Sequence, residues 1–538
     1  MTDSMKVLIV GAGPAGLSLA MHLKHLGVTP TIIDKAKQHD QNSGGVFLQG
    51  QSLISLGYSM SERLSKQGNA ITAGTIRSKS KELFSFDLTD LPGQFFAPMT
   101  ISQFKIEQEL IAELSRLGVE IQWGHELREL TQNEQGCEVS IKAKDVETSK
   151  FDYVVGADGF DSFVREAAGF GIVEPSNPGE WIVANINLRS SGLESSKVQM
   201  SIHEGRLTAL FPLDPQGNFR IIRNSLSGDH TKPEYWADAL AEFGVFELPE
   251  VHWSNRYTVF EKYSPQLRTG RVFLVGDAAH AHTPIGGQGM NLGLLESANL
   301  AWKLSMVAQG ADDDLLDIYS EERSKVAISS FAKSNIVFRL IVTKSGLLQK
   351  LRDIFISSSK ALSPVRDYLG ASLRGEDEVY PAGGINREFF DSVQVSDYRE
   401  LPEDQDIDNF FKGMKAGSQF SVYNEKLNSL VDDNAFTALL FDGREKTDDG
   451  RARVLAAYEF LNSQPLMKAY VLSEEDEPYK HLDNFILDPN MHLHNQLHAS
   501  MESVYIIRPD MHIGFRSAPI DIPAIEAWWD DLLSGETE

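Results

Sequence analysis

Cysteine is almost absent from this 538-residue chain, which contains Cys137 alone. A single cysteine cannot form a disulfide within the chain, and no group of cysteines and histidines has the spacing of a zinc site. These absences exclude a disulfide-stapled scaffold and a structural zinc domain. No metal is therefore predicted.

Long hydrophobic runs are missing as well. No stretch approaches the ~20 apolar residues of a membrane-spanning helix, and the only early apolar run is too short for a signal peptide. We therefore expect a cytoplasmic protein with no integral membrane segment. Residues 336–356 are apolar with interspersed charges, which favours an amphipathic packing helix over a membrane-surface or partner helix.

Basic residues are scarce relative to acidic ones. The 50 Lys and Arg residues against 76 Asp and Glu residues give a formal net charge of -26. Such a surface repels nucleic acid and anionic lipid, so nucleic acid is not expected as a partner. The length exceeds the size at which a single core stops growing, and two or three domains are expected.

A nucleotide-binding pattern opens the chain. The apolar run Lys6–Val10 predicts a buried parallel strand, and a glycine-rich turn leads from it into a helix with leucines at helical spacing. Such a turn brings backbone amides close to a pyrophosphate. The next predicted strand ends at Asp34, followed by Lys35, close to the ~20-residue offset at which an acid accepts hydrogen bonds from a ribose.

A second pattern of this kind lies more than 250 residues downstream. The apolar strand Arg271–Val275 leads into Gly276 and Asp277, and a glycine-rich turn over residues 284–291 opens the next helix. A strand with an acid at its carboxyl end, followed by such a turn, is typical of an α/β protein that holds a bulky phosphorylated cofactor. His280 is interpreted either as a packed, hydrogen-bonded residue or as a participant in the chemistry.

An Asp-Gly pair, Asp158 and Gly159, follows an apolar run between these two patterns. On its own the pair is typical of an ordinary turn. In this order and at these separations, however, the glycine-rich turn, the Asp-Gly segment and the Gly-Asp segment resemble the single-component (class A) flavoprotein monooxygenases, the FAD-dependent aromatic hydroxylases. The resemblance covers roughly residues 5–345.

The resemblance implies a cofactor role for particular residues. The glycines of the first turn would face the FAD pyrophosphate, Asp34 the ribose and Asp277 the ribityl chain. The turn at 284–291 would lie beside the isoalloxazine ring, where helix amides favour the negative charge of a reduced flavin. The complete implied set is Gly11, Gly13, Pro14, Ala15, Gly16, Asp34, Lys35, Gln103, Asp158, Gly159, Gly276, Asp277, Pro284, Gly287, Gln288, Gly289, Met290 and Asn291.

The sequence departs from the family pattern at one place. Many members carry an arginine shortly after the second strand, and the comparable stretch here, residues 42–48, reads NSGGVFL. This departure leaves open how the moving flavin and the nicotinamide are contacted. The two glycines could instead widen the path for a large substrate.

The predicted fold is α/β, with a Rossmann-like FAD-binding domain interrupted by a β-sheet substrate domain. Strand-like runs suggest that this inserted sheet roofs the flavin and holds the substrate between roof and ring. Residues 381–384 and the acidic stretch 400–408 are predicted linkers. The predicted boundaries are 1–75, 101–180 and 266–395 for the FAD-binding domain, 76–100 and 181–265 for the substrate domain, and 396–538 for a carboxyl-terminal domain.

The carboxyl-terminal domain contains two predicted strands around an Arg508-Pro509-Asp510 turn. This arrangement is similar to the thioredoxin-like tail of the phenol hydroxylase branch. Thioredoxin redox chemistry does not follow, because the Cys-x-x-Cys pair is absent. The domain is interpreted as structural, or as the contact surface of a homodimer.

The implied activity is an NAD(P)H-consuming monooxygenation. NADPH or NADH would reduce FAD, O2 would add to give a C4a-hydroperoxyflavin, and one oxygen atom would pass to a phenolic or polycyclic aromatic substrate. Two alternatives stay open: Baeyer-Villiger oxygen insertion on the same fold, and a flavin-bound regulatory or interaction protein with slow turnover. No catalytic base is assigned; the candidates in the roof are His203, Arg206, Arg220, Arg223 and Tyr257.

Overall fold

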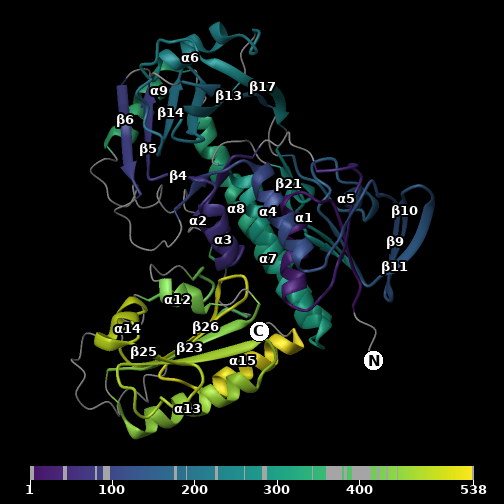
Figure 1. The fold of residues 1–538 in the computed structure, drawn as a ribbon, viewed down its shortest axis with the longest axis vertical. Helices are drawn as coiled ribbons and strands as arrows, with labels where there is room; N and C mark the ends of the chain where they lie inside the picture. The colour runs from purple at the N-terminus through teal and green to yellow at the C-terminus, as the bar shows by residue number, and fades with distance from the viewer. Residues whose placement is uncertain are drawn as a thin grey trace.

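A computed structural model of the chain shows three layers stacked along its long axis (Figure 1). Pro284 and the two predicted linkers lie outside the residues that the structure describes. The described residues are 5–39, 45–78, 81–88, 97–174, 179–188, 191–224, 228–259, 261–281, 287–341, 343, 345–358, 379–380, 385–390, 413–420, 425–431, 434–444 and 446–535.

The middle layer is a six-stranded sheet with the order β19-β20-β12-β1-β2-β8. Strand β1 pairs in parallel with β12 and β2, and β12 pairs in parallel with β20. The carboxyl ends of β1, β12 and β20 therefore meet at one edge of the sheet, together with the turn that follows each of these strands. The strands are β1 (Val7–Val10), β2 (Thr31–Asp34), β8 (Ile121–Trp123), β12 (Tyr153–Gly156), β19 (Arg268–Thr269) and β20 (Val272–Leu274).

Two long helices run side by side in this layer. The Ser297 and Ser305 hydroxyls of α7 (Gln288–Ala308) donate to the carbonyls of Ala15 and Leu26, both at 2.7 Å, and so join α7 to α1 (Pro14–His25). The other helices of the layer are α2 (Gly50–Ser55), α3 (Tyr58–Ser65), α4 (Gln103–Arg116), α5 (Phe163–Ala167) and α8 (Asp317–Ile341).

Three small sheets complete the middle layer. One is the antiparallel meander β9-β10-β11, and the others contain only two-residue strands. Their bounds are β9 (Glu126–Asn133), β10 (Gly136–Lys142), β11 (Val146–Phe151), β3 (Phe47–Leu48), β4 (Asn69–Ala70), β7 (Met99–Thr100), β18 (Lys262–Tyr263) and β21 (His280–Ala281).

The top layer, here called the roof sheet, has seven strands in the order β17-β13-β16-β15-β14-β5-β6. It draws strands from both predicted insertions. One face packs around the buried Trp236 and α6 (Ala237–Ala241), and the other is turned toward the middle layer. The strands are β5 (Ala73–Ser78), β6 (Lys81–Asp87), β13 (Gly179–Asn187), β14 (Lys197–His203), β15 (Arg206–Pro212), β16 (Asn218–Asn224) and β17 (Glu250–Val259).

The expectation of one amphipathic helix over residues 336–356 is wrong. Helix α8 ends at Ile341, and a separate helix, α9 (Gly346–Ser358), begins at a glycine. Glycine in a helix interior costs about 1 kcal/mol relative to alanine, which disfavours one continuous helix through Gly346. None of the helices in the described part of the chain is long and apolar enough to cross a membrane.

The bottom layer, here called the carboxyl-terminal layer, is a six-stranded sheet with the order β22-β27-β26-β23-β24-β25. Strands β26 and β27 flank the Arg508-Pro509-Asp510 turn, which confirms that expectation. The elements are β22 (Arg387–Phe390), β23 (Phe436–Asp442), β24 (Met467–Ser473), β25 (Phe485–Leu487), β26 (Glu502–Ile507), β27 (Ile513–Ala518), α12 (Glu425–Leu430), α13 (Asp448–Ser463), α14 (His492–Gln496) and α15 (Ile522–Ser534).

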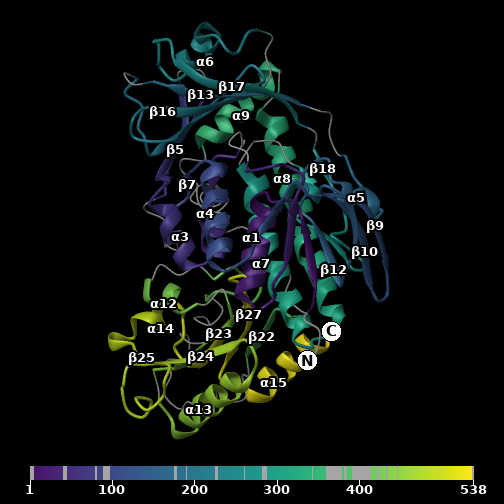
Figure 2. The same cartoon turned by 45° about the vertical axis from the view of Figure 1, so that its right-hand side comes forward.

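One apolar core is shared by the middle and carboxyl-terminal layers. Trp302 of α7 meets Phe436 of β23 edge to face, with ring centroids 5.4 Å apart. Phe436 in turn contacts Trp529 of α15 at 5.4 Å. The carboxyl-terminal layer is therefore packed onto α7 through buried aromatic side chains (Figure 2).

Candidate active site

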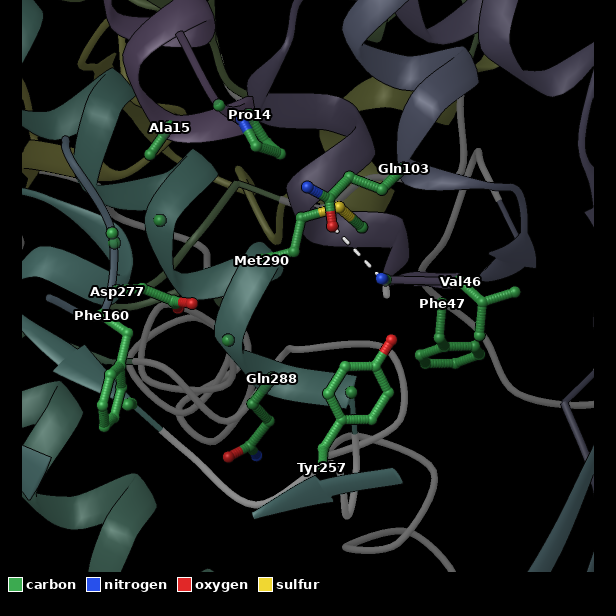
Figure 3. A pocket seen from close by; sticks show the side chains of 18 of the residues that line it. Pro14, Ala15, Val46, Phe47, Gln103, Phe160, Tyr257, Asp277, Gln288 and Met290 are labelled. Atoms are coloured by element: carbon green, nitrogen blue, oxygen red, sulfur yellow. Dashed lines mark hydrogen bonds between the residues drawn. The ribbon is translucent and has the colours of Figure 1, made fainter. Parts of the chain in front are cut away.

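A cavity of about 630 Å³ lies between the middle layer and the roof sheet (Figure 3). Its floor comes from the first glycine-rich turn, the Gly276-Asp277 turn and the start of α7. A second cavity of about 360 Å³ continues from it, and Gly13, Ala157 and Gly159 line both. The two together form an elongated space along the carboxyl edge of the middle sheet.

Most of the predicted cofactor residues line this space. Gly16 and Asn291 line neither cavity. The first cavity is lined by Gly13, Pro14, Ala15, Gln103, Gly159, Gly276, Asp277, Gly287, Gln288, Gly289 and Met290. The second is lined by Gly11, Gly13, Asp34, Lys35, Asp158 and Gly159, with His125 and Arg128 beside them.

The first glycine-rich turn leaves room for a group that lies against the backbone. A Cβ atom added to Gly13 would meet no protein atom within 4 Å. Gly16 is needed for a different reason, because a Cβ there would lie 2.0 Å from the carbonyl oxygen of Gly11. The open space at Gly13 and the amides at the start of α1 fit a pyrophosphate.

Asp34 holds this turn in place from the neighbouring strand. Its Oδ2 accepts a hydrogen bond from the Ala12 amide at 2.8 Å, and its Oδ1 accepts one from Ala36 at 2.7 Å. An ionised carboxylate has about four acceptor positions, so both oxygens can still accept from a ribose hydroxyl.

Asp158 is turned toward the protein. Its carboxylate accepts hydrogen bonds from the Ser162 hydroxyl and from the Val164 amide at the start of α5. Burial raises the pKa of Asp158 above its usual range. Gly159 of the same segment lines both cavities.

Arg165 links two of the predicted motifs, and the sequence carried no periodic signal for it. The buried guanidinium donates to the carbonyl of Ala278 and to the carbonyl of Phe160, each at 2.8 Å. The Asp-Gly segment and the Gly-Asp segment are thereby tied together behind the cavity wall.

Asp277 lies on the floor of the cavity, and its carboxylate faces into it (Figure 3). Removal from bulk water raises the pKa of Asp277. The turn that carries it is held by Glu296 of α7, whose Oε2 accepts from the Gly276 amide at 2.8 Å. The other oxygen of Glu296 lies 2.5 Å from Nε2 of His280.

His280 is thus a packed, hydrogen-bonded residue. Burial acts to lower the pKa of His280, but the charge and hydrogen bond of Glu296 outweigh it, and the pKa is raised. The ion pair is fully buried beneath the Gly276-Asp277 turn. It positions the backbone on which Asp277 stands.

The start of α7 closes the floor of the cavity. Gly287 adopts φ +63°, a left-handed conformation that suits glycine, and leads into the first helical turn, whose amides have no partner within the helix. Asn291 fastens this turn to β3: its Nδ2 donates to the carbonyls of Phe47 at 3.0 Å and Gly287 at 2.6 Å. Gln103 accepts from the Gly45 amide at 3.2 Å (Figure 3).

The roof sheet presents an apolar, aromatic surface to the cavity. Of the five roof residues considered as catalytic candidates, Tyr257 alone is among the described residues that line it. Its hydroxyl points into the same space as the Asp277 carboxylate (Figure 3). The other roof and upper-wall residues are Phe47, Trp181, Val183, Phe211, Ile222 and Thr258.

The remaining roof candidates are engaged elsewhere. Arg206 pairs with Glu204 at 3.1 Å, and His203 lies 3.1 Å from the same carboxylate. Arg223 lies 3.9 Å from Glu242. Arg220 donates to Asn185 at 2.9 Å, and burial lowers its pKa to about 10.

Residues 4–334 match the model of a family described as FAD binding domain, which is more than half of the chain. The chain belongs to the class A FAD-dependent monooxygenases. The protein is therefore a flavin-dependent aromatic monooxygenase that uses FAD, and NAD(P)H and O2 are the co-substrates typical of its family.

Two relatives and one solved structure show the range of this likeness. A 6-methylpretetramide 4-monooxygenase of Streptomyces rimosus is 29% identical over 376 residues, which are 68% of this chain and 67% of that protein. A pentachlorophenol 4-monooxygenase of Sphingobium chlorophenolicum is 32% identical over 342 residues, which are 60% of this chain and 62% of that protein.

The solved structure extends the likeness over the whole chain. CabE, an aromatic hydroxylase from angucycline biosynthesis, superposes with a TM-score of 0.70 at 23% identity, covering 100% of both chains. This likeness concerns the fold, and it includes the carboxyl-terminal layer.

Two glycine substitutions should separate binding from folding. We expect Gly13→Ala to raise the FAD dissociation constant at least about tenfold, or ~1.4 kcal/mol, with little change in stability, because the new methyl group enters open space. Gly16→Ala should cost about 1–3 kcal/mol of stability through overlap with Gly11. Flavin titration and thermal unfolding of the apoprotein measure the two effects; equal FAD affinity in Gly13→Ala and wild type would contradict the assignment.

The buried His280–Glu296 pair should make stability pH-dependent. Because Glu296 raises the pKa of His280 above the ~6.5 of an unfolded chain, the contribution of the pair is complete below that pH. It is lost as the pH rises through the raised value. The stability difference between wild type and His280→Gln should therefore shrink with rising pH in unfolding experiments, and a difference that grows would refute the ion pair.

Proposed function

We propose that this monooxygenase hydroxylates a flat, uncharged phenolic aromatic with fused rings. The observation that carries the proposal is the division of the cavity of about 630 Å³ into two chemically different halves. Glycine backbone and Asp277 form the floor, and aromatic and aliphatic side chains form the roof. A planar apolar molecule fits between them.

The charges around the cavity support an uncharged substrate. Among the described residues that line it, Asp277 is the only one with a full charge. A carboxylate buried there would lack the cation that normally compensates it, and burial of an unpaired charge is strongly unfavourable. A phenol, by contrast, can hydrogen-bond to the hydroxyl of Tyr257.

The names of two relatives agree with this substrate class, whereas a third, a 3-(3-hydroxy-phenyl)propionate/3-hydroxycinnamic acid hydroxylase, is named for carboxylated substrates. One relative acts, by its name, on 6-methylpretetramide and another on pentachlorophenol. We assign this chain to the same general group of phenolic and polyketide-type substrates. The assignment extends to the phenol hydroxylase-like branch of the family.

The proposed FAD site is the full set of residues predicted from the sequence. Support comes from the described members of this set, most of which line the two cavities. FAD supplies the oxygen-transfer chemistry when bound, after reduction by NAD(P)H and reaction with O2. The chain would hold its phosphates at Gly13, would present the amides at the start of α7 to the ring, and would exclude water with the roof sheet. Asp277 would accept hydrogen bonds from the ribityl chain.

The proposed domain division keeps the boundaries predicted from the sequence with one shift: β22, which falls inside the predicted FAD-binding range, pairs with β27 and is assigned to the carboxyl-terminal layer. Residues 76–100 and 181–265, which contain most of the roof sheet, are proposed as the substrate domain because Trp181, Phe211 and Tyr257 line the cavity. Residues 396–538 are proposed as a thioredoxin-like domain that also mediates a homodimer. Support comes from the strand order β27-β26-β23-β24, in which β23 and β24 are parallel and α13 lies between them in sequence.

Anaerobic flavin reduction tests the function. Purified holoenzyme is mixed with NADPH or NADH, and flavin bleaching is followed with two matched groups of phenols: fused-ring phenols without a carboxylate, and hydroxybenzoates or hydroxyphenylpropionates with one. We expect acceleration by the first group alone. Acceleration by the carboxylated group alone would overturn the substrate class, and no acceleration by either group would overturn the hydroxylase proposal.

Labelled oxygen then distinguishes hydroxylation from Baeyer-Villiger insertion. With ¹⁸O2, a hydroxylated product carries the label as a phenolic hydroxyl on an intact carbon skeleton. A label within a new ester or lactone would replace hydroxylation by ring expansion.

Tyr257→Phe should selectively slow the reaction of the phenolic substrate. Loss of one hydrogen bond is worth about 0.5–1.5 kcal/mol, or a roughly 2- to 13-fold decrease in kcat/KM, for a neutral phenol, and about 1.5–3 kcal/mol, or a roughly 10- to 150-fold decrease, where the phenolate reacts. Tyr235→Phe is the matched control, because Tyr235 packs against Trp236 on the roof sheet and does not line the cavity. Equal kinetics of Tyr257→Phe and wild type would remove Tyr257 from the substrate site.

A further inference from the structure

A buried polar cluster connects α7 to the carboxyl-terminal layer. Asn299 and Lys303 come from α7, Glu322 from α8, and Arg508 and Asp510 from the turn between β26 and β27. Each of these five side chains is at most 3% exposed. Charged residues are rarely buried to this extent unless they are paired.

Arg508 is the centre of the cluster. It donates to both oxygens of Glu322, at 2.7 and 3.1 Å, and through Nε to Asp510 at 3.0 Å. The planar guanidinium can satisfy two carboxylates at once, whereas a lysine presents a single point charge. Arg508 therefore fastens its own turn to α8.

The same carboxylates bind α7. Lys303 donates to Glu322 at 2.9 Å. Asn299 donates to Glu322 at 2.9 Å and to Asp510 at 2.8 Å. Helix α7 thus donates hydrogen bonds to the Asp510 turn of the carboxyl-terminal layer and to Glu322 of α8, and it forms an ion pair with Glu322.

Helix α7 extends from this cluster to the floor of the cavity. Its first residues, among them Gln288 and Met290, line the floor (Figure 3). Glu296, one turn before Asn299, holds the Gly276-Asp277 turn. Because an α-helix transmits displacement along its axis, the position of the segment from Asn299 to Lys303 also sets the position of Glu296 and of the floor.

We propose that the carboxyl-terminal layer is part of the flavin-binding machinery, with Arg508 acting through Glu322, Asn299 and Lys303 as a positioning residue for α7. The proposal depends on FAD binding and is independent of the substrate class. It differs from the interpretation of the tail as a separate docking module, because the cluster places the Arg508-Pro509-Asp510 turn inside the molecule.

The first test compares two arginines that undergo the same substitution. Arg508→Lys should raise the FAD dissociation constant of the full-length apoprotein by about 5- to 150-fold, the usual range of coupling between sites, and should alter the flavin absorption spectrum. Arg516→Lys is the matched control: Arg516 is equally buried on β27 and donates to Glu388 of β22 at 3.0 Å, within the carboxyl-terminal layer. It should leave FAD affinity and spectrum unchanged.

The reciprocal effect supplies a second measurement. If the turn positions α7 for FAD, FAD must also stabilise the turn, because coupling acts equally in both directions. Amide hydrogen exchange around Asp510 should slow when FAD is added to wild type or Arg516→Lys. This protection should be lost in Arg508→Lys.

A milder variant provides a second test in case Arg508→Lys does not fold. Lys303→Met removes the ion pair between α7 and Glu322 and leaves only the hydrogen bond from Asn299, while Arg508 keeps both of its carboxylates. It should also weaken FAD binding and reduce the protection of the turn. Two results would overturn the proposal. The first is an equal loss of FAD affinity in Arg508→Lys and Arg516→Lys. The second is an unchanged FAD affinity in Arg508→Lys or, where that variant does not fold, in Lys303→Met.

Discussion

Parallel pairing of three short strands is the constraint on which the site depends. Val10 of β1 is paired with Gly156 of β12, and Gly156 is paired with Leu274 of β20. Because parallel strands end at the same edge, turns that are separated by more than 100 residues in the chain meet there. The cofactor space follows from this register, and Arg165 and Glu296 then fasten the turns to one another and to α7.

The long helix α7 is the second organising element. It contributes to the floor of the cavity at one end, holds the Gly276-Asp277 turn near its middle, contacts the carboxyl-terminal layer at Asn299 and Trp302, and pairs with Glu322 of α8 through Lys303. Buried ion pairs such as these add little to stability compared with apolar packing, yet removal of one partner is costly. Their value here lies in defining one position for the helix.

The two sides of the cavity differ in chemical character. Backbone amides and Asp277 form the side suited to a phosphorylated, redox-active cofactor, and the roof sheet forms a mostly apolar side that also carries the hydroxyls of Tyr257 and Thr258. The family membership and the fold agree with this division. Substrate discrimination would then depend on the roof sheet, because the face that each strand turns toward the cavity determines which side chains contact the aromatic substrate.

Local sequence patterns determined the cofactor half, because a strand, a glycine-rich turn and an acid are close together in the chain and need little else to be recognised. The substrate half was decided by tertiary structure, since the face that each strand turns inward depends on packing across the roof sheet; among five candidates, Tyr257 alone lines the cavity within the described residues. The carboxylate of Asp158 turned toward α5 because Ser162 and Val164 satisfy it locally. The cluster around Arg508 joins residues up to 211 positions apart. In the sequence these charged residues look the same as solvent-exposed ones, because they become paired only when the layers pack together and bury them.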